Sequence, residues 1–214
     1  MSKVFHIDPE NPSAEVINLA ASVLRDGGVV LFPTDTVYGI GASAHSWCGA
    51  PELFDIKGRD VSLPLPWLVE DDNALDRYGV DVPEYAHSLA KRFWPGELTI
   101  VVKASDMVGK DFRDKRGTVA LRCSNHEVVQ ELIRASGSPI ATTSANTSGL
   151  PAAAKFEDLE ERIIAAADVV LDGGEAHIGV HSTIVDCTGP EPVVVRDGAV
   201  PAEDIMTAAH ALDN

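Results

Sequence analysis

The spacing of apolar residues predicts helices that alternate with short buried strands along most of the chain. Apolar positions three and four residues apart predict helices at 16–24, 51–56, 83–94, 126–135, 156–166 and 201–212. Short apolar runs predict strands at 29–32, 65–69, 98–102, 118–121, 139–141, 169–171, 183–185 and 193–195. Such interleaving is typical of an α/β fold. Because the alternation is irregular, we expect a mixed rather than a purely parallel sheet.

Three stretches between these elements are predicted to be loops. Residues 33–42, PTDTVYGIGA, follow the strand at 29–32, and residues 142–149 are nearly all hydroxyl, amide or small. The polar stretch 105–117 is expected to be a mobile segment over a site. The chain shows no repeat, low-complexity segment or linker, so residues 1–214 are predicted to form a single domain.

Composition places the chain among ordinary soluble proteins, with 45% hydrophobic and 23% charged residues. No apolar run reaches membrane length and the start lacks a signal-peptide pattern, so we expect a cytoplasmic protein that does not contact membranes. Cys48, Cys123 and Cys187 form no CxxC pair, which indicates neither a disulfide framework nor a zinc site.

The formal net charge of -16 makes clusters of cations stand out. Lys57 and Arg59 flank Gly58 at the end of a predicted short helix, while Arg122 and Arg196 each end a strand. Lys and Arg can clamp a phosphate, and an Arg at a strand end can hold a carboxylate through two hydrogen bonds. As alternatives, cations are favourable at a helix C-terminus without any ligand, and a single Arg after a strand is often simply exposed.

Two polar loops carry candidate binding residues. In SPIATTSANTSGLPA, at 138–152, small side chains let backbone N–H groups and hydroxyls approach an anion, phosphate above all. An ordinary Ser/Thr/Asn turn with a glycine stop is an equal alternative. In PTDTVYG, hydroxyls and a carboxylate follow a strand, where ligands bind in α/β sheets. Local capping by Asp35 or Thr36 is the alternative there.

Neither a protein-bound metal nor a serine nucleophile is indicated. His177 and His181 are four residues apart, but no helix is expected there and no HExxH motif occurs. Ser144 lies in TSANTSG, which is not the GxSxG elbow, and no order of His and Asp supports a triad.

Six segments together resemble the YrdC-like family of threonylcarbamoyl-AMP synthases. In the family's order they are GGVVLFPTDTVYGIGA, KGR followed by PLP, WPGELTIVV, TVALRCSNHE, SPIATTSANTSGLPA, and HSTIVDCTG with VVVRDG. The best-known signature of the family is the KxR and SxN pair, here Lys57, Arg59, Ser144 and Asn146. The match runs from Gly27 to Gly198, so the chain looks like the short, single-domain form.

The resemblance implies a fold and a reaction. The fold would be a twisted mixed parallel/antiparallel sheet with flanking helices around a deep, open cavity. The enzyme, a nucleotidyltransferase, would make threonylcarbamoyl-AMP and pyrophosphate from L-threonine, bicarbonate and ATP, with Mg²⁺ held mainly by the ATP phosphates and water. A partner transferase complex would pass the threonylcarbamoyl group to tRNA, so weak or no direct RNA binding is expected.

The resemblance also implies roles for individual residues. Those expected in catalysis are Lys57, Arg59, Ser144 and Asn146. Those expected to bind ATP are Arg59, Thr118, Ser144 and Arg196. Those expected to bind L-threonine are Thr34, Arg122, Thr142 and Ser182. No metal ligand is expected from the protein itself.

The chain departs from the family at four places. Leu63 and Leu68 stand where the family usually has Asn and often has His, which removes a polar nucleotide contact and a threonine contact. Cys123-Ser124 replaces a hydrophobic-Pro pair, and His181 replaces a Pro. We expect the core chemistry to survive these changes and the substrate affinity to be altered.

Two other functions remain open. Similar domains occur in carbamoyltransferases that use carbamoyl phosphate, although those carry extra domains and zinc motifs that this chain lacks. An RNA-binding module is the second alternative, but the net charge of -16 argues against general nucleic-acid affinity, which depends on counterion release by Lys and Arg.

Overall fold

Ten strands form one sheet in the computed structural model, which describes residues 3–46, 49–58, 65–176 and 178–210. The strands are β1 (Lys3–His6), β2 (Val29–Phe32), β3 (Gly39–Ser43), β4 (Trp67–Leu68), β5 (Leu98–Lys103), β6 (Thr118–Arg122), β7 (Ile140–Ser144), β8 (Val169–Asp172), β9 (Thr183–Asp186) and β10 (Val193–Arg196). Their order is β1-β8-β2-β3-β7-β4-β6-β5-β9-β10. Four neighbouring pairs are parallel and five are antiparallel, which confirms the predicted mixed sheet.

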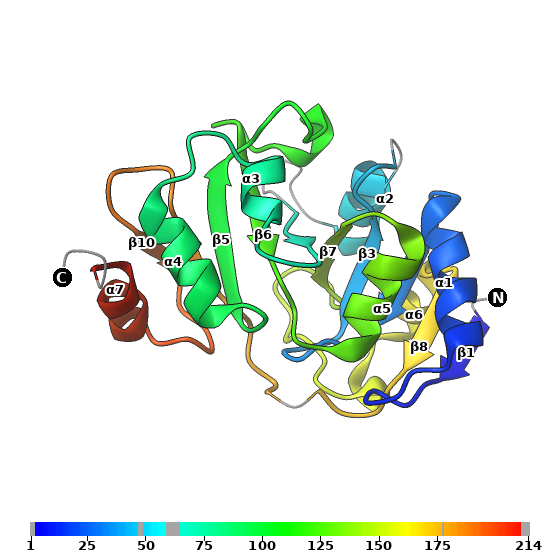
Figure 1. Cartoon of the computed structure of the whole chain (residues 1–214). Helices are drawn as coiled ribbons and strands as arrows, with labels where there is room; N and C mark the ends of the chain where they lie inside the picture. Colours follow the sequence, from blue (N-terminus) through cyan, green and yellow to red (C-terminus); the bar gives the residue numbers. More distant parts are fainter. Residues whose placement is uncertain (1–2, 47–48, 59–64, 177, 211–214) are drawn as a thin grey trace.

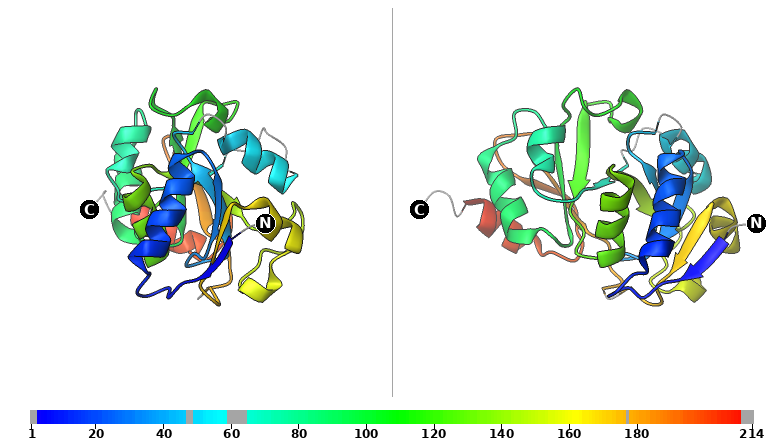
Figure 2. Two further views of the ribbon diagram at one scale, coloured as in Figure 1. Left: turned by 90° about the vertical axis from the view of Figure 1, so that its right-hand side faces the viewer. Right: turned by 45° about the vertical axis from the view of Figure 1, so that its right-hand side comes forward.

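Helices cover both faces of this sheet (Figures 1 and 2). They are α1 (Ala14–Arg25), α2 (Gly49–Lys57), α3 (Ala74–Tyr78), α4 (Glu84–Phe93), α5 (Glu127–Ser136), α6 (Glu161–Ala166) and α7 (Ala202–His210), with 3₁₀ turns η1 (Lys110–Phe112) and η2 (Phe156–Asp158). Figure 2 shows α1 and α5 on one side of the sheet and α2 on the other. The predicted α/β class with flanking helices is therefore confirmed.

The alternation of side chains along β2 explains why both faces need helices. Val30 and Phe32 belong to the core cluster that contains apolar residues of α1 and α5. Val29 and Leu31 belong to the cluster on the other face, which includes residues of α2 and α6. Because successive strand residues point to opposite faces, the all-apolar sequence of β2 requires burial on both sides.

The structure corrects several predicted boundaries. Residues 33–42 are only partly a loop, since β3 pairs with β2 and β7, and residues 142–149 likewise begin inside β7. The predicted strand at 65–69 is paired only at Trp67–Leu68, and the predicted helix at 156–166 is broken into η2 and α6. The patterns also missed β1, α3 and η1. The two glycines of β3 explain its omission, because they erase the apolar signal that marks a strand.

Residues 105–117 do not form the expected mobile segment over a site. Val108 and Phe112 are buried in the core, and the Phe112 ring packs edge-on against Trp67 at 5.4 Å between centroids. Arg113 donates hydrogen bonds to the backbone oxygens of Val108 and Ser105 at 2.8 and 3.0 Å. No residue of this segment is among the described lining of the central pocket.

The described residues contain no group of acidic, His or Cys side chains suited to a metal ion. Cys123 and Cys187 are buried free thiols, and burial raises their pKa values to about 11 and about 12, so both stay protonated at neutral pH. Cys48 lies outside the described residues. In the part of the chain that the structure describes, no helix combines the length and apolarity needed to cross a membrane.

Candidate functional site

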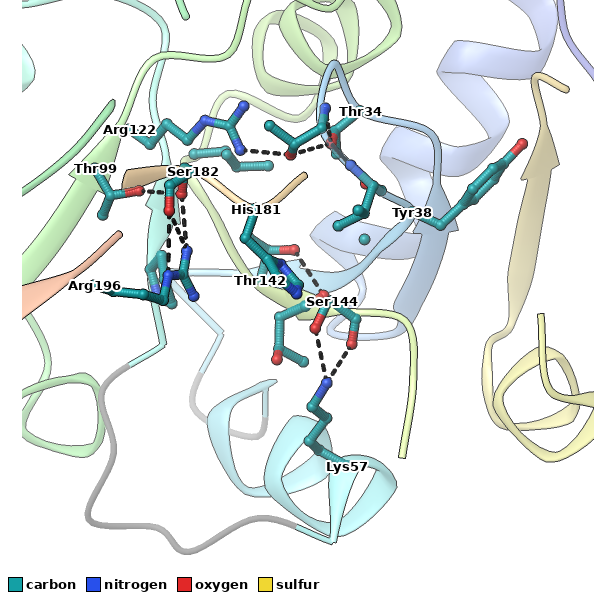
Figure 3. A pocket seen from close by; sticks show the side chains of 16 residues that line it. Thr34, Tyr38, Lys57, Thr99, Arg122, Thr142, Ser144, His181, Ser182 and Arg196 are labelled. Atoms are coloured by element: carbon teal, nitrogen blue, oxygen red, sulfur yellow. Dashed lines mark hydrogen bonds between the residues drawn. The ribbon is translucent and has the colours of Figure 1, made fainter. Parts of the chain in front are cut away.

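A pocket lies at the centre of the sheet, where the turn after β2 meets the ends of β4, β6 and β7 (Figure 3). Its described lining residues are Thr34, Thr36, Val37, Tyr38, Gly39, Lys57, Pro66, Leu68, Thr99, Arg122, Thr142, Thr143, Ser144, His181, Ser182 and Arg196. Three of them are cations, and none of those that the structure describes is acidic. In a protein of net charge -16, this pocket is a local concentration of positive charge suited to anions.

Lys57 joins the end of α2 to the Ser/Thr-rich loop. Its Nζ donates hydrogen bonds to the backbone oxygen of Ser144 at 2.7 Å, to Ser144 Oγ at 2.9 Å and to Asn146 Oδ1 at 2.6 Å. The Asn146 amide nitrogen donates to the backbone oxygens of Thr147 and Leu150, which turns Oδ1 toward Lys57. The structure thus brings together three of the four residues predicted for catalysis. The fourth, Arg59, lies outside the described residues.

Lys57 and Ser144 have different roles toward an anion in the pocket. Lys57 is 6% exposed and has its three donors engaged, so it offers positive charge to a neighbouring anion rather than an open donor. Because Lys57 occupies a lone pair of Ser144 Oγ, the hydroxyl proton of Ser144 is left to donate into the pocket. Strand β7, which carries Ser144, packs closely against β3 because Gly41 has no side chain: a Cβ there would lie 2.6 Å from Ile140 Cγ2.

The loop after Ser144 is held by a second polar cluster. Glu160 accepts hydrogen bonds from the backbone N–H of Thr147 at 2.6 Å and from the Thr147 hydroxyl. Arg162 donates to Thr147 Oγ1 at 2.8 Å and to the backbone oxygen of Ile56, in α2, at 2.9 Å. The hydrogen bond from the Thr147 hydroxyl, then that from its backbone, lowers the pKa of Glu160, so the carboxylate is ionised at neutral pH.

Glu160→Gln is expected to loosen this loop. The neutral amide is a weaker acceptor for the Thr147 hydroxyl and loses the ion pair with Arg162. Hydrogen–deuterium exchange of the Thr147 amide should accelerate about two- to fivefold, the range typical of an exposed charged contact. Glu161→Gln, one residue along on the exposed side of α6, is the matched control. Equal exchange in both variants would show that the loop keeps its shape without Glu160.

Arg122 ends β6 and is held from three sides. Its Nε donates to the backbone oxygen of Gly96 and its Nη1 to Thr36 Oγ1, each at 3.0 Å. Its Nη2 lies 2.7 Å from Asp35 Oδ1, which also accepts from Ser124 Oγ at 2.7 Å. Nη2 is buried and makes no contact of hydrogen-bond geometry with a described residue. Asp35 thus orients Arg122 instead of capping the local backbone.

Thr34 and Thr142 both line the pocket, but their hydroxyls differ in the hydrogen bonds that they can still make to a ligand. Thr34 Oγ1 donates to the backbone oxygen of Val37 at 2.7 Å and accepts the N–H groups of Thr36 and Val37. That hydroxyl is used within its own turn, so Thr34 caps the local backbone, a role that the sequence suggested for Asp35 or Thr36 instead. Thr142 Oγ1 donates to the backbone oxygen of Ile40 at 3.1 Å and keeps acceptor capacity toward the pocket.

Ser182 and Arg196 form the opposite wall. Arg196 donates through Nε and Nη2 to the backbone oxygen of Ser182 at 3.2 and 2.7 Å, and through Nη2 to Ser182 Oγ at 3.1 Å. Thr99 Oγ1 lies 2.8 Å from Ser182 Oγ. These contacts fix one edge of an otherwise exposed guanidinium at the rim of the pocket.

Two of the departures from the family pattern also lie in the pocket wall. Leu68 is 2% exposed and presents an apolar surface. Figure 3 shows the His181 imidazole between Arg196 and Ser144. Burial, followed by the charges of Arg196 and Lys57, lowers the pKa of His181 from its usual 6.5, so the ring is neutral at neutral pH. Leu63 lies outside the described residues.

The structure does not bring Thr118 to the described lining of this pocket. Thr118 is buried at the start of β6, the opposite end from Arg122, and its backbone N–H donates to Asp114 at 2.9 Å. Its contact with ATP stays a prediction.

Sequence reasoning did not single out five polar residues of the described lining as ligand contacts: Thr36, Tyr38, Thr99, Thr143 and His181. Thr36 and Tyr38 belong to PTDTVYG, and His181 directly precedes Ser182, so their neighbours carried a signal. No sequence pattern pointed to Thr99 as a site residue. It lies inside an apolar strand and reaches Ser182 only through the parallel pairing of β5 with β9.

The chain is similar to known proteins over most of its length. The model of the family Sua5_yciO_yrdC, described as "Telomere recombination", matches residues 22–198. Threonylcarbamoyl-AMP synthase from Pyrococcus abyssi is 40% identical over 189 residues. That match covers 88% of this chain and 56% of the relative, so the chain spans about half of that protein's length.

Two solved structures have the same fold. Sua5 of P. abyssi complexed with L-threonine superimposes with a TM-score of 0.92 at 37% identity, over 97% of this chain and 61% of that one. YciO of E. coli gives a TM-score of 0.88 at 28% identity, over 96% of this chain and 100% of that one. With the family model matched over most of its length, the chain belongs to the Sua5/YciO/YrdC family.

Proposed function

We propose that this chain is a threonylcarbamoyl-AMP synthase, which forms threonylcarbamoyl-AMP and pyrophosphate from L-threonine, bicarbonate and ATP. The observation that carries the proposal is the pocket lining, in which Lys57, Arg122 and Arg196 have no acidic neighbour among the described lining residues. The reactants bring a carboxylate, a carbamate and a triphosphate, all of them anions. The P. abyssi relative of that name and the binding of L-threonine by P. abyssi Sua5 support the same assignment.

The two sides of the pocket suit the two substrates. Arg122, oriented by Asp35, would pair with the threonine carboxylate, with Thr142 and Ser182 beside the amino acid. Lys57 and Arg196 would neutralise phosphate charge, and Ser144 would donate its hydroxyl proton to a phosphate oxygen. Arg59 and Thr118 remain further predicted contacts to ATP.

The chemistry requires alignment and charge neutralisation more than covalent help. An oxygen of the threonine carbamate attacks the α-phosphorus, and the new P–O bond forms as the bond to the bridging oxygen of the β-phosphate breaks. Pyrophosphate leaves with that electron pair. Lys57 lies where negative charge develops, and its hydrogen bonds to Ser144 and Asn146 hold it there without reorganisation.

Magnesium would enter as part of the substrate. The described lining residues include no carboxylate, which Mg²⁺ prefers, so the phosphates and water would hold the ion. In its cellular setting, the product would pass to a transferase complex that modifies tRNA. The net charge of -16 is consistent with a cytoplasmic enzyme that binds RNA weakly or not at all.

Pyrophosphate release is expected to require L-threonine and bicarbonate together. The chemical reason is that no carbamate exists to attack ATP when either is omitted. The measurement is coupled detection of pyrophosphate, with the AMP-linked product identified by mass spectrometry. Serine should be a poorer substrate, because loss of one methyl contact discriminates by about 1–3 kcal/mol. Pyrophosphate formed at the same rate without threonine would contradict the proposal.

The same assay separates the alternative functions. A carbamoyl-phosphate-dependent enzyme would consume carbamoyl phosphate and show no dependence on bicarbonate. An RNA-binding module would retain RNA on a filter at physiological salt and release no pyrophosphate. RNA retention is not expected from a protein with a net charge of -16. Turnover without bicarbonate is not expected from the proposed reaction, in which bicarbonate supplies the carbamate carbon.

A further inference from the structure

The proposed reaction needs a proton acceptor, and the pocket offers few. An α-amino group is mostly protonated at neutral pH, and its nitrogen then has no lone pair with which to attack carbon. Lys57, Arg122 and Arg196 are cations, and burial raises the pKa of Tyr38 to about 12, so its phenol keeps its proton. Because the described part of the lining holds no carboxylate, His181 is the titratable side chain there that can accept a proton at neutral pH.

The position of His181 suits that task. The residue directly precedes Ser182 and lies in the turn that leads into β9. Figure 3 shows its ring pointing into the pocket among the labelled side chains. Its imidazole makes no hydrogen bond to any residue that the structure describes, so neither ring nitrogen is committed to a structural contact. A threonine held by Arg122 would have its ammonium group inside the same pocket.

We propose that the imidazole of His181 accepts the proton of the threonine ammonium group and so frees the amine for carboxylation. The inference rests on the proposed function. The N–H bond breaks, its electron pair stays on nitrogen, and the proton moves to His181. The free amine then attacks the carbon of bicarbonate: the N–C bond forms, the C–OH bond breaks, and the amine proton leaves with that hydroxide as water. The imidazolium returns its proton to solvent.

The charges around His181 suit a base that must release its proton again after each reaction cycle. Lys57 and Arg196 act on it from α2 and β10, and Arg122 and Tyr38 line the same pocket from β6 and from the turn before β3. Burial, followed by these positive charges, keeps the ring unprotonated before reaction and favours release of the proton afterwards. A bound triphosphate offsets that field, so nucleotide binding is expected to raise the pKa of His181 and to increase its strength as a base when both substrates are present.

The first test compares His181→Asn with His45→Asn. His45 is more exposed than His181, but burial lowers its pKa as well, and it does not line the pocket. At about pH 7, kcat/KM for threonine should fall about 100-fold in His181→Asn, the low end for loss of a general base, mainly through kcat. The deficit should shrink as the pH approaches about 9, because solution then supplies free amine. His45→Asn should follow the wild type, and circular dichroism checks that both variants are folded.

The second measurement follows the His181 imidazole by NMR with and without a non-hydrolysable ATP analogue. An increase in its pKa on binding of the analogue supports the proposal. An unchanged pKa overturns it, as does a His181→Asn deficit of the same size at every pH, which would indicate a packing role. Wild-type protein that forms no threonine-dependent pyrophosphate would instead overturn the proposed function itself, and the role of His181 with it.

Discussion

Replacing Lys57 with methionine is expected to slow adenylate formation by about 10²–10³-fold, equivalent to ~2.7–4 kcal/mol in the barrier. Methionine keeps the unbranched shape and most of the length of the side chain, and it removes the charge that lies beside Ser144. The loss should appear in kcat more than in the KM for ATP, because the charge matters most as negative charge shifts toward the departing pyrophosphate. Single-turnover measurement of the AMP-linked product checks this expectation directly.

Two controls separate chemistry from packing in this variant. Lys155→Met removes an exposed lysine paired with Glu175 outside the pocket, and it should leave the rate unchanged. Asn146→Ala removes one partner of Lys57 but keeps its charge, so a smaller loss is expected. Near-normal catalysis with a lowered melting temperature in Lys57→Met would mean that Lys57 only ties α2 to the loop.

Arg122→Gln is expected to abolish threonine binding and to destabilise the fold by about 3–5 kcal/mol. The second effect arises because Asp35 would remain as a buried carboxylate without its cation. Both side chains of this pair are 7% exposed, so water cannot replace the missing partner. Chemical denaturation measures the stability, and calorimetric titration with L-threonine measures the binding.

A double variant separates the two roles of Arg122. Asp35→Asn combined with Arg122→Gln removes both charges of the pair, so a large part of the lost stability should return. Threonine binding should not return, because the guanidinium that would hold the carboxylate is still absent. Recovery of binding in the double variant would show that Arg122 serves the fold alone and that the carboxylate binds elsewhere.

The apolar pattern of the sequence was sufficient to predict most helices and the long strands. Helix α1 follows from apolar residues at helical spacing, and β2 from four consecutive apolar residues. The pattern failed at β3, whose sequence GIGAS is held in place by backbone hydrogen bonds to β2 and β7. It also failed for residues 105–117, whose polar composition concealed the buried side chains of Val108 and Phe112.

The sequence by itself determined the fold class and the residue types of the pocket. The predicted site depends on strand ends rich in hydroxyls, on the KxR and SxN elements, and on two arginines that follow strands. All of these are features of short segments that can be recognised in the sequence alone. These local features were enough to predict an anion-binding site on a mixed sheet, and the family to which the chain belongs.

Only the tertiary structure decided which of these residues are in contact and which hydrogen-bonding groups each still has available for a ligand. Lys57 and Asn146 are 89 positions apart, and Asp35 and Arg122 are 87 apart, yet each pair is in contact. Sheet order sets such contacts, because strands β2, β3 and β7 become neighbours through pairings that no local pattern encodes. The tertiary structure also sets the environment of each group: burial, then the charges of Arg196 and Lys57, keeps His181 neutral, and the buried Asp35 carboxylate orients Arg122.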